Sequence, residues 1–219
     1  MLGKFITLEG GEGVGKSTQV PRIIDELKKR GIEAIRTREP GGTEGAEKIR
    51  NLLVKSNAPN WDMVTELMLF FAARRDHVEK LIKPALAEGK WVICDRFADS
   101  SFAYQCYGGN LPLETALEQY KIALGDFWPD LTILFDINNQ ENLQKAIDRE
   151  GEEKRFELKG LSFHEKVKQG FKELAQKFPE RYVSLTEQKT IPEMTEIIMQ
   201  QIDNRFSINP LLIQKNNGR

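Results

Sequence analysis

The chain has 219 residues, 40% hydrophobic and 30% charged, which is long enough to bury a sizeable core. Its 32 Lys and Arg side chains nearly balance 33 Asp and Glu side chains, so no overall field attracts nucleic acid or an anionic membrane. No apolar run approaches the roughly 20 residues of a membrane-spanning helix, and two cysteines do not indicate a disulfide framework. We expect a cytoplasmic globular protein with no nucleic-acid or membrane partner.

Short β-rich apolar runs alternate with helical patterns along the chain. Strand patterns occur at Phe5–Leu8, Glu33–Thr37, Trp91–Cys94, Leu131–Phe135 and Arg181–Ser184, and the second and fifth of these are the weaker ones. Helical periodicity covers about 16–30, 44–55, 62–88, 112–123, 139–149, 162–178 and 191–205. Apolar strands separated by helices are typical of a parallel sheet covered on both faces, so we expect an α/β fold with five parallel strands.

The distribution of Gly, Ser and Pro residues along the chain favours a single domain. No linker rich in Gly, Ser or Pro divides it, and no internal repeat is present. We expect one domain over residues 1–205, followed by a C-terminal tail over 206–219. Within the long helical stretch 62–88, Pro84 predicts a bend or a break between two helices, because an interior proline costs ~3 kcal/mol.

A glycine-rich segment follows the first predicted strand. It reads Gly10-Gly-Glu-Gly-Val-Gly-Lys-Ser17 and fits G-x-x-x-x-G-K-[ST] without a departure. Backbone N–H groups of such a loop bind phosphate oxygens, Lys16 reaches the β- and γ-phosphates, and the Ser17 hydroxyl binds Mg²⁺. An incidental turn is the plainer interpretation, but the flanking strand and helix favour a P-loop NTPase fold. The expected ATP-binding residues are Gly10, Gly11, Glu12, Gly13, Val14, Gly15, Lys16, Ser17 and Thr18.

An Asp-Arg pair follows the strand pattern that ends at Cys94. Ligands of open parallel sheets lie beyond the carboxyl ends of the strands, so Asp95 and Arg96 should face the P-loop. Asp95 suits Mg²⁺ or its waters, and Arg96 suits a bidentate contact with a phosphate group. A surface ion pair in a loop is the alternative interpretation. The P-loop favours the functional one, because phosphoryl transfer needs a second anion site in line with the γ-phosphate.

Aromatic and polar side chains that could hold a base occur in two places. Phe70 and Arg74 are four residues apart and share one helix face, where a ring could stack on a base and a guanidinium could bind its edge. Core packing is the plainer interpretation of Phe70 and Phe71, and we expect it to apply to one of them. Tyr104 and Gln105 pair a flat ring with an amide that suits a pyrimidine bearing N–H and C=O groups.

Five segments together resemble the thymidylate kinase family, in its order and approximate spacing. They are Glu9–Lys16, Thr37–Thr43, Leu69–Arg74, Asp95–Gln105 and Pro129–Thr132, and the resemblance covers about residues 3–205. It implies ATP- and Mg²⁺-dependent phosphorylation of dTMP to dTDP, and it adds a homodimer that the sequence alone does not indicate.

The resemblance also implies which residues would bind the phosphate, sugar and base of dTMP. Arg96 would bind the phosphate with the help of Arg50, and Tyr104 would pack against the deoxyribose and exclude a 2′-hydroxyl. Glu12 would accept from the 3′-hydroxyl or act through Mg²⁺. The base would lie on Phe70, with Arg74 on a carbonyl and Gln105 on the polar edge. The implied dTMP site comprises Glu12, Arg50, Phe70, Arg74, Arg96, Ser101, Tyr104 and Gln105.

A charge run at 148–157 could be a solvated loop between helices or part of a mobile lid over about 149–160. Members of the family without an arginine after the acidic P-loop residue carry one in the lid, and here that P-loop position is Gly13. Arg149 is the first candidate for a lid arginine on the transferring phosphoryl group, and Arg155 the second. The expected catalytic set is Glu12, Lys16, Asp95, Arg96 and Arg149.

One departure and two alternatives accompany this interpretation. Cys106 stands where the family has glycine, which would bring a thiol near the substrate. A deoxynucleoside kinase also pairs a P-loop with an acidic-Arg loop, but prefers an uncharged acceptor. A regulatory nucleotide-binding module would bind a partner protein and show no turnover stimulated by an acceptor. A GTPase is disfavoured, because the sequence has no Asn-Lys-x-Asp motif.

Overall fold

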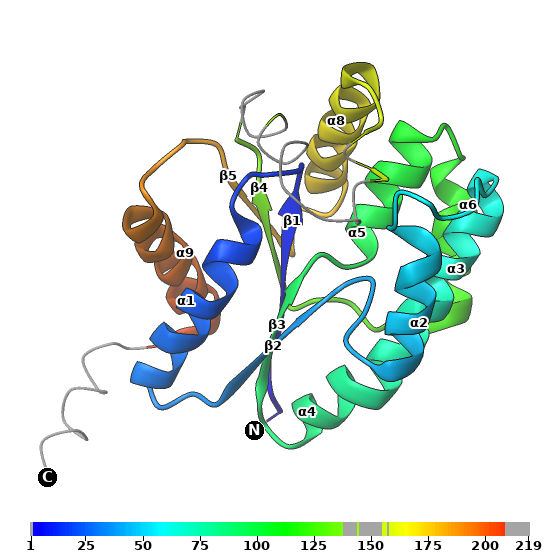
Figure 1. Ribbon diagram of the computed structural model, residues 1–219. Coiled ribbons are helices and arrows are strands. Elements are labelled where there is room, and N and C mark those ends of the chain that lie inside the picture. Colours follow the sequence, from blue (N-terminus) through cyan, green and yellow to red (C-terminus); the bar gives the residue numbers. More distant parts are fainter. Residues whose placement is uncertain (1, 138–143, 145–154, 157, 209–219) are drawn as a thin grey trace, which may run out of the picture.

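The computed structural model describes residues 2–137, 144, 155–156 and 158–208 (Figure 1). Five parallel strands form one sheet in the order β2-β3-β1-β4-β5. They are β1 (Phe5–Gly10), β2 (Ala34–Arg38), β3 (Trp91–Asp95), β4 (Leu131–Phe135) and β5 (Tyr182–Leu185). The predicted five-stranded parallel sheet is therefore confirmed, including its two weaker strands.

Helices cover both faces of this sheet, as predicted. Figure 1 shows α1 and α9 on one face and the remaining helices on the other. The helices are α1 (Lys16–Lys29), α2 (Glu44–Leu53), α3 (Met63–His77), α4 (Lys83–Ala87), α5 (Ala98–Ser101), α6 (Leu113–Leu124), α8 (Leu161–Lys177) and α9 (Ile191–Phe206). The predicted helix over 139–149 lies outside the described residues, except for residue 144.

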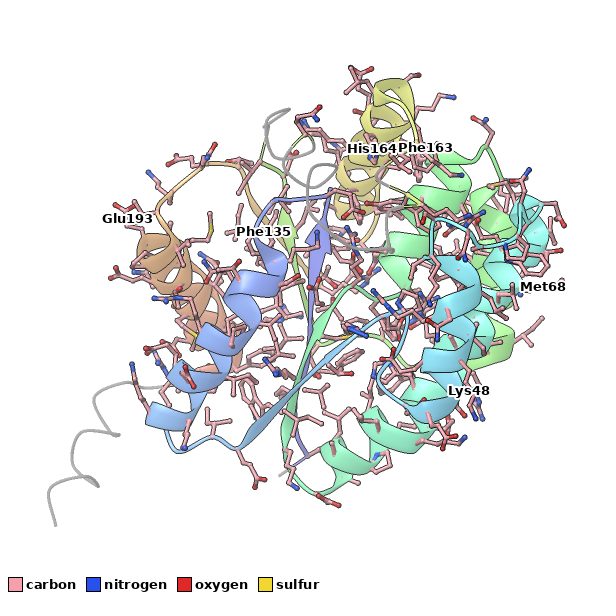
Figure 2. The ribbon with its side chains drawn as sticks, in the orientation of Figure 1. Lys48, Met68, Phe135, Phe163, His164 and Glu193 are labelled. Atoms are coloured by element: carbon pink, nitrogen blue, oxygen red, sulfur yellow. The ribbon has the colours of Figure 1, made fainter. Side chains whose placement is uncertain are left out.

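The central strand β1 supplies side chains to two separate cores. Ile6 and Leu8 pack with Ile23 of α1 and Ile198 of α9, all fully buried. Phe5 points to the opposite face and joins the larger core, because successive strand residues face opposite sides. Burying one such side chain contributes roughly 1.5–3 kcal/mol to the stability of the fold. The end of β1 that leads into the P-loop is therefore firmly fixed. In Figure 2 Lys48 and Met68 point away from these cores, at the outer surface of α2 and α3.

The predicted interruption near Pro84 is present, but it begins earlier in the chain. The helix α3 ends at His77, a π-helical segment runs over Val78–Ile82, and α4 begins at Lys83 with Pro84 in its first turn. A proline is tolerated in a first helical turn, where its missing N–H group needs no partner. The wider turn therefore lies before the proline instead of at it.

A helical segment that the sequence analysis did not predict follows β3. The helix α5 continues into a π-helical segment, Phe102–Gly108, which packs closely against α8. A Cβ atom on Gly170 would lie 2.6 Å from the ring of Tyr107, so only glycine allows this approach. The segment is rich in aromatic residues that favour strands, and tertiary packing overrides that preference.

Phe206, the first residue of the predicted tail, is the last residue of α9, and its ring lies 4.9 Å from that of Trp91. Residues 209–219 lie outside the described residues. Within the described part of the chain, no helix is long and apolar enough to cross a membrane.

Candidate active site

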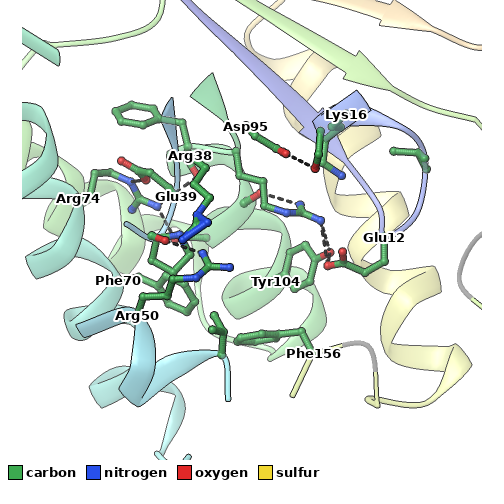
Figure 3. A pocket seen from close by; sticks show the side chains of 18 of the residues that line it. Glu12, Lys16, Arg38, Glu39, Arg50, Phe70, Arg74, Asp95, Tyr104 and Phe156 are labelled. Atoms are coloured by element: carbon green, nitrogen blue, oxygen red, sulfur yellow. Dashed lines mark hydrogen bonds and ion pairs between the residues drawn. The ribbon is translucent and has the colours of Figure 1, made fainter. Parts of the chain in front are cut away.

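A pocket opens beyond the carboxyl ends of β1, β2 and β3, where three loops and α3 meet (Figure 3). Most of the residues predicted to bind ATP or dTMP line it together. These are Glu12, Gly13, Val14, Gly15, Lys16, Ser17, Thr18, Arg50, Phe70, Arg74, Asp95, Arg96, Ser101, Tyr104 and Gln105. Gly10 and Gly11 line an adjoining pocket between the P-loop and α8. Arg149 lies outside the described residues.

The P-loop turns from β1 into α1 through residues in left-handed conformations. Gly15 has φ 97° directly before α1, a value that only glycine adopts without strain. The Nζ atom of Lys16 donates to the carbonyl oxygens of Gly10, at 3.0 Å, and Gly11, at 2.5 Å. Burial and the nearby guanidinium of Arg96 lower the pKa of Lys16 to about 8. The ammonium group is thus held over the loop that would carry the phosphates.

Two oxygen-bearing side chains meet beside the P-loop. The Ser17 hydroxyl donates to Asp95 Oδ2 at 2.5 Å, and Oδ1 of Asp95 is buried without a hydrogen-bond partner among the described residues. Mg²⁺ takes one or two protein oxygens and completes its shell with phosphates and water, so this pair fits it. The described residues contain no group of three or more His, Cys, Asp and Glu side chains that could hold a metal by themselves.

Arg96 joins the loop after β3 to the P-loop. Its backbone has φ 69°, a left-handed conformation that is uncommon for a residue with a side chain. Its Nη1 atom donates to the Gly10 carbonyl at 2.9 Å and to Ser100 Oγ at 3.0 Å, and Nη2 lies 2.9 Å from Glu12 Oε1. A guanidinium that presents two nitrogens beside a P-loop can bind the phosphate of an acceptor.

The buried carboxyl group of Glu9 stabilises this unusual conformation. It accepts from the backbone N–H of Phe97 at 2.7 Å and from the hydroxyl of Ser100 at 2.6 Å. Burial and the nearby Asp99 raise the pKa of Glu9 to about 8, and Arg96 opposes that shift. Glu9 therefore fixes the residues on both sides of the turn that aims Arg96 at the P-loop.

Glu12 remains ionised although only 17% of its side chain is exposed. Burial by itself raises the pKa of this carboxyl, but the charges of Arg96 and Lys16 and a hydrogen bond from Tyr104 outweigh it and lower the pKa to about 2. The Tyr104 hydroxyl donates to Glu12 Oε1 at 2.5 Å and accepts from Arg96 Nη2 at 3.2 Å. The three side chains form one network at the centre of the pocket.

Two of the three guanidinium nitrogens of Arg74 donate hydrogen bonds within the protein. Its Nε atom donates to Glu39 Oε2 at 2.6 Å, and Nη2 donates to the Phe97 carbonyl and to Ser101 Oγ. The third nitrogen, Nη1, is buried and has no hydrogen-bond partner among the described residues. An unpaired buried donor costs about 1–3 kcal/mol, so this atom is available to a ligand that enters the pocket.

Aromatic rings enclose the same end of the pocket. Phe70 lines it and also packs in the core, whereas Phe71, 2% exposed, packs in the same core without lining the pocket. Phe156 also lines the pocket, with its ring 5.9 Å from that of Phe70 and 5.7 Å from that of Tyr104. Such a set of rings can hold a flat heterocycle.

Two predicted residues lie differently from their expected roles. The guanidinium of Arg155 lies at the aromatic end of the pocket, where Nη1 is 2.5 Å from Glu66 Oε2 and donates to the Leu53 carbonyl, and not against the P-loop. The thiol of Cys106 does not approach the pocket: it is buried, with Sγ 3.8 Å from the Pro112 carbonyl. Burial raises the pKa of Cys106 to about 12, which disfavours the nucleophilic thiolate form.

Seven residues that line the pocket are not among the predicted site residues: Arg38, Glu39, Pro40, Val54, Phe97, Ser100 and Phe156. Arg38 is the last residue of β2 and pairs with Glu47 at 3.1 Å, and the rule that found Arg96 at a strand end could have found it. Ser100 and Phe156 carry no pattern that marks them. His77 is buried between Glu39 and Thr37 and contacts both side chains.

Comparison with known proteins adds independent information. The family model described as thymidylate kinase matches residues 8–198. A thymidylate kinase from Caulobacter vibrioides is 47% identical over 208 residues, covering 94% of this chain and 99% of that protein. One from Magnetococcus marinus is 41% identical over 95% of this chain and all of that protein. The crystal structure of a thymidylate kinase from Ehrlichia chaffeensis is similar, with a TM-score of 0.76 and 33% identity over 93% of this chain and 99% of that one.

Proposed function

The chain belongs to the thymidylate kinase family, and we propose that the pocket beyond β1, β2 and β3 binds both of its substrates. The chain is a dTMP kinase, a phosphotransferase that uses ATP to convert dTMP to dTDP. The two-site assignment rests on the contacts of Arg96 with Gly10 and Glu12. These contacts place a side chain that can bind the phosphate of the acceptor directly beside the P-loop.

ATP lies on the P-loop in this proposal. The residues from Gly10 to Thr18 surround its phosphates, and Lys16 contacts the β- and γ-phosphates. Support comes from the position of the Lys16 ammonium over the loop carbonyls, from which it can turn to a phosphate. The low pKa of this buried lysine indicates a place that favours an anionic partner.

The phosphate of dTMP binds Arg96, with Arg50 and Arg38 beside it. Both additional arginines line the pocket, and Arg50 is anchored by a 2.6 Å hydrogen bond to the Pro40 carbonyl. The deoxyribose lies on Tyr104, whose hydroxyl is held by Glu12 and Arg96. Glu12 is then within reach of the 3′-hydroxyl as a hydrogen-bond acceptor.

Thymine lies at the aromatic end, on Phe70. The unpaired Arg74 Nη1 is a donor for the 4-carbonyl, and Gln105 Oε1, also buried and unpaired among the described residues, is an acceptor for the N3–H group. Ser101 contributes through Arg74, to which its hydroxyl is bonded. This donor–acceptor order matches thymine and is opposite to that of cytosine.

Mg²⁺ would be held by Ser17 and Asp95, whose unpaired Oδ1 supports the assignment. When bound, the ion would neutralise phosphate charge and orient the β- and γ-oxygens. In the reaction, an oxygen of the dTMP phosphate bonds to the γ-phosphorus while the bond to the β–γ bridging oxygen breaks, and ADP leaves with that oxygen. Lys16 and Arg96 stabilise the charge in transit, so no covalent enzyme intermediate is needed.

We propose that an arginine of the lid adds a third positive charge beside the phosphoryl group during its transfer. Arg149 is the candidate, because Arg155 is engaged by Glu66 and Leu53 at the far end of the pocket. We further propose that residues 1–205 act as a single kinase domain, and that the enzyme works in the cytoplasm, because its substrates are charged nucleotides of that compartment.

A homodimer is proposed from exposed apolar side chains on α2, α3 and α6. Val64 and Met68 lie one turn apart on α3 and are 41% and 55% exposed, and Leu52 and Ile122 are 43% and 86% exposed. Sedimentation velocity should give a dimer of the native chain and a monomer of Met68→Glu. A native chain that sediments as a monomer at micromolar concentration would contradict the proposal.

Release of ADP from ATP and Mg²⁺ tests the assignment of the acceptor. With dTMP, dUMP, thymidine, dCMP, AMP and GMP as separate acceptors, dTMP should stimulate most and dUMP less. Stimulation by thymidine without stimulation by dTMP would contradict the role of Arg96 as a phosphate ligand.

A further inference from the structure

Glu66 is a buried carboxylate directly behind the wall of the pocket. It lies on α3, one turn before Phe70, and its side chain is fully buried. Its Oε1 atom accepts a 2.9 Å hydrogen bond from Gln105 Nε2, and its Oε2 atom forms a 2.5 Å ion pair with Arg155 Nη1. Glu66 does not line the pocket itself, so any effect on a ligand must pass through its two partners.

The contact with Glu66 determines which way the Gln105 amide faces. A carboxylate that pairs with a guanidinium is ionised and only accepts hydrogen bonds, so the amide must turn its NH₂ group toward Glu66. The carbonyl oxygen Oε1 is then left for the pocket. Gln105 is 1% exposed and lines the pocket, and Oε1 has no hydrogen-bond partner among the described residues.

A free amide in the same place could present either group to a base. With its oxygen facing the ligand it suits the N3–H of thymine, and with its NH₂ group facing the ligand it suits the bare N3 of cytosine. Because the 4-position also differs between these bases, Arg74 Nη1 adds a donor that suits only a carbonyl. The orientation of one amide therefore decides which pyrimidine is stabilised.

We propose that Glu66 is a positioning residue that selects thymine over cytosine by locking the orientation of the Gln105 amide. The proposal rests on the proposed function, since it takes Gln105 as a residue that contacts the base. Arg155 is the counter-ion that keeps Glu66 an acceptor, and it is held in place by the Leu53 carbonyl at 3.1 Å.

Stability alone gives no reason for this arrangement. Replacing a buried ion pair by apolar residues of similar volume is often neutral or stabilising. The pair is explained if its role is to orient a hydrogen-bonding group toward the ligand.

The test compares dTMP with 5-methyl-dCMP, which differs from it only at ring positions 3 and 4. In the native enzyme the ratio of kcat/KM for these two acceptors should be high, and in Glu66→Gln it should fall about tenfold to a hundredfold, because a neutral amide no longer dictates the orientation of Gln105. The Kd for ATP should change less than twofold in this variant, as the contacts of Glu66 with described residues go to Gln105 and Arg155 and not to the P-loop.

A double-mutant cycle separates positioning from a general structural effect. In the Gln105→Ala background, Glu66→Gln should leave the ratio unchanged, because the group through which Glu66 acts is absent. An unchanged ratio in the single variant overturns the proposal, and so does an equal fall in both backgrounds.

A second variant keeps the test valid if Glu66→Gln does not fold. Glu66→Met with Arg155→Met removes both charges together and leaves no unpaired ion in the core. It should show the same loss of discrimination, and a native ratio in this variant overturns the proposal. Failure of the proposed function would look different, because the native enzyme would then turn over neither acceptor.

Discussion

The guanidinium of Arg96 lies 2.9 Å from the carboxylate of Glu12, so the loop after β3 and the P-loop meet in one ion pair. Both side chains are 17% exposed, at the middle of the pocket between the predicted ATP and dTMP ends. A phosphate that binds Arg96 is therefore delivered next to the loop that holds the donor. This proximity is what an in-line transfer between two bound nucleotides requires.

Arg96→Ala should lower kcat/KM for dTMP by at least about a thousandfold, since the residue both binds the acceptor and stabilises charge in the transition state. The Kd for ATP, measured by calorimetry, should change less than about fivefold. Arg96→Lys keeps the charge but not the bidentate geometry, so its kcat/KM for dTMP should lie between the values of the native enzyme and of Arg96→Ala. Equal losses in dTMP turnover and ATP binding would refute the assignment of Arg96 to the acceptor.

The neighbours Phe70 and Phe71 both pack in the core, but of the two only Phe70 lines the pocket, so dTMP binding should distinguish them. Phe70→Ala should raise KM for dTMP by about five- to a hundredfold, because stacking of a base on an aromatic ring contributes ~1–3 kcal/mol. Phe71→Ala should leave KM for dTMP nearly unchanged and lower the free energy of unfolding by about 3–5 kcal/mol, since this ring is 2% exposed in the core and does not line the pocket. Steady-state kinetics and chemical denaturation check both, and a reversed pattern would exchange the two roles.

The pKa of Lys16 predicts a decline in activity at alkaline pH. The lysine is charged below about pH 8 and neutral above it, and only the charged form stabilises the phosphates. The profile of kcat/KM for ATP reports the free enzyme, so it should be level below pH 8 and fall up to tenfold per pH unit above it. A level profile up to pH 9.5 would contradict this prediction.

Glu9 provides the control for that profile, because its raised pKa is also about 8. In Glu9→Gln the alkaline fall should persist if Lys16 causes it. Glu9 has a separate effect on stability: the folded protein holds its proton between pH 4.5 and 8, whereas the unfolded chain does not. The free energy of unfolding of the native chain relative to Glu9→Gln should thus decrease over this window, by on the order of a few kcal/mol.

Asp95→Asn should raise the Mg²⁺ concentration needed for half-maximal activity by about tenfold or more, because an amide oxygen is a weaker ligand than a carboxylate. The variant keeps an acceptor for the Ser17 hydroxyl, so the local fold should be preserved. Titration of the rate with Mg²⁺ at saturating ATP measures the shift. An unchanged Mg²⁺ dependence would exclude Asp95 from the metal site.

Local patterns were sufficient for the fold and for most of the residues that line the candidate pocket. The P-loop from Gly10 to Ser17 is a contiguous motif between a strand and a helix, and Asp95 and Arg96 were found because parallel strands end at one edge. The two weaker strand patterns were also correct: they correspond to β2 and β5, which are the edge strands of the parallel sheet.

The residues that escaped prediction act through contacts distant in the sequence. Glu66 looks like an ordinary acidic residue in the first turn of a helix, and only the folded chain brings Gln105 and Arg155 against it. Phe156 is a single ring within a charge run, and its contacts with Phe70 and Tyr104 are equally non-local. The position of Cys106 was wrong for a related reason, because a helical turn that was not predicted aims it away from the pocket.

The most direct test of the central claim is a competition among acceptors for one labelled phosphoryl group. The enzyme is given ATP labelled at the γ-phosphate, Mg²⁺ and equimolar dTMP, dUMP, 5-methyl-dCMP and AMP, and the labelled products are separated and identified. The account predicts that dTDP carries most of the label and that Arg96→Ala transfers none. Label found mainly in another diphosphate would contradict it, as would label released only as inorganic phosphate.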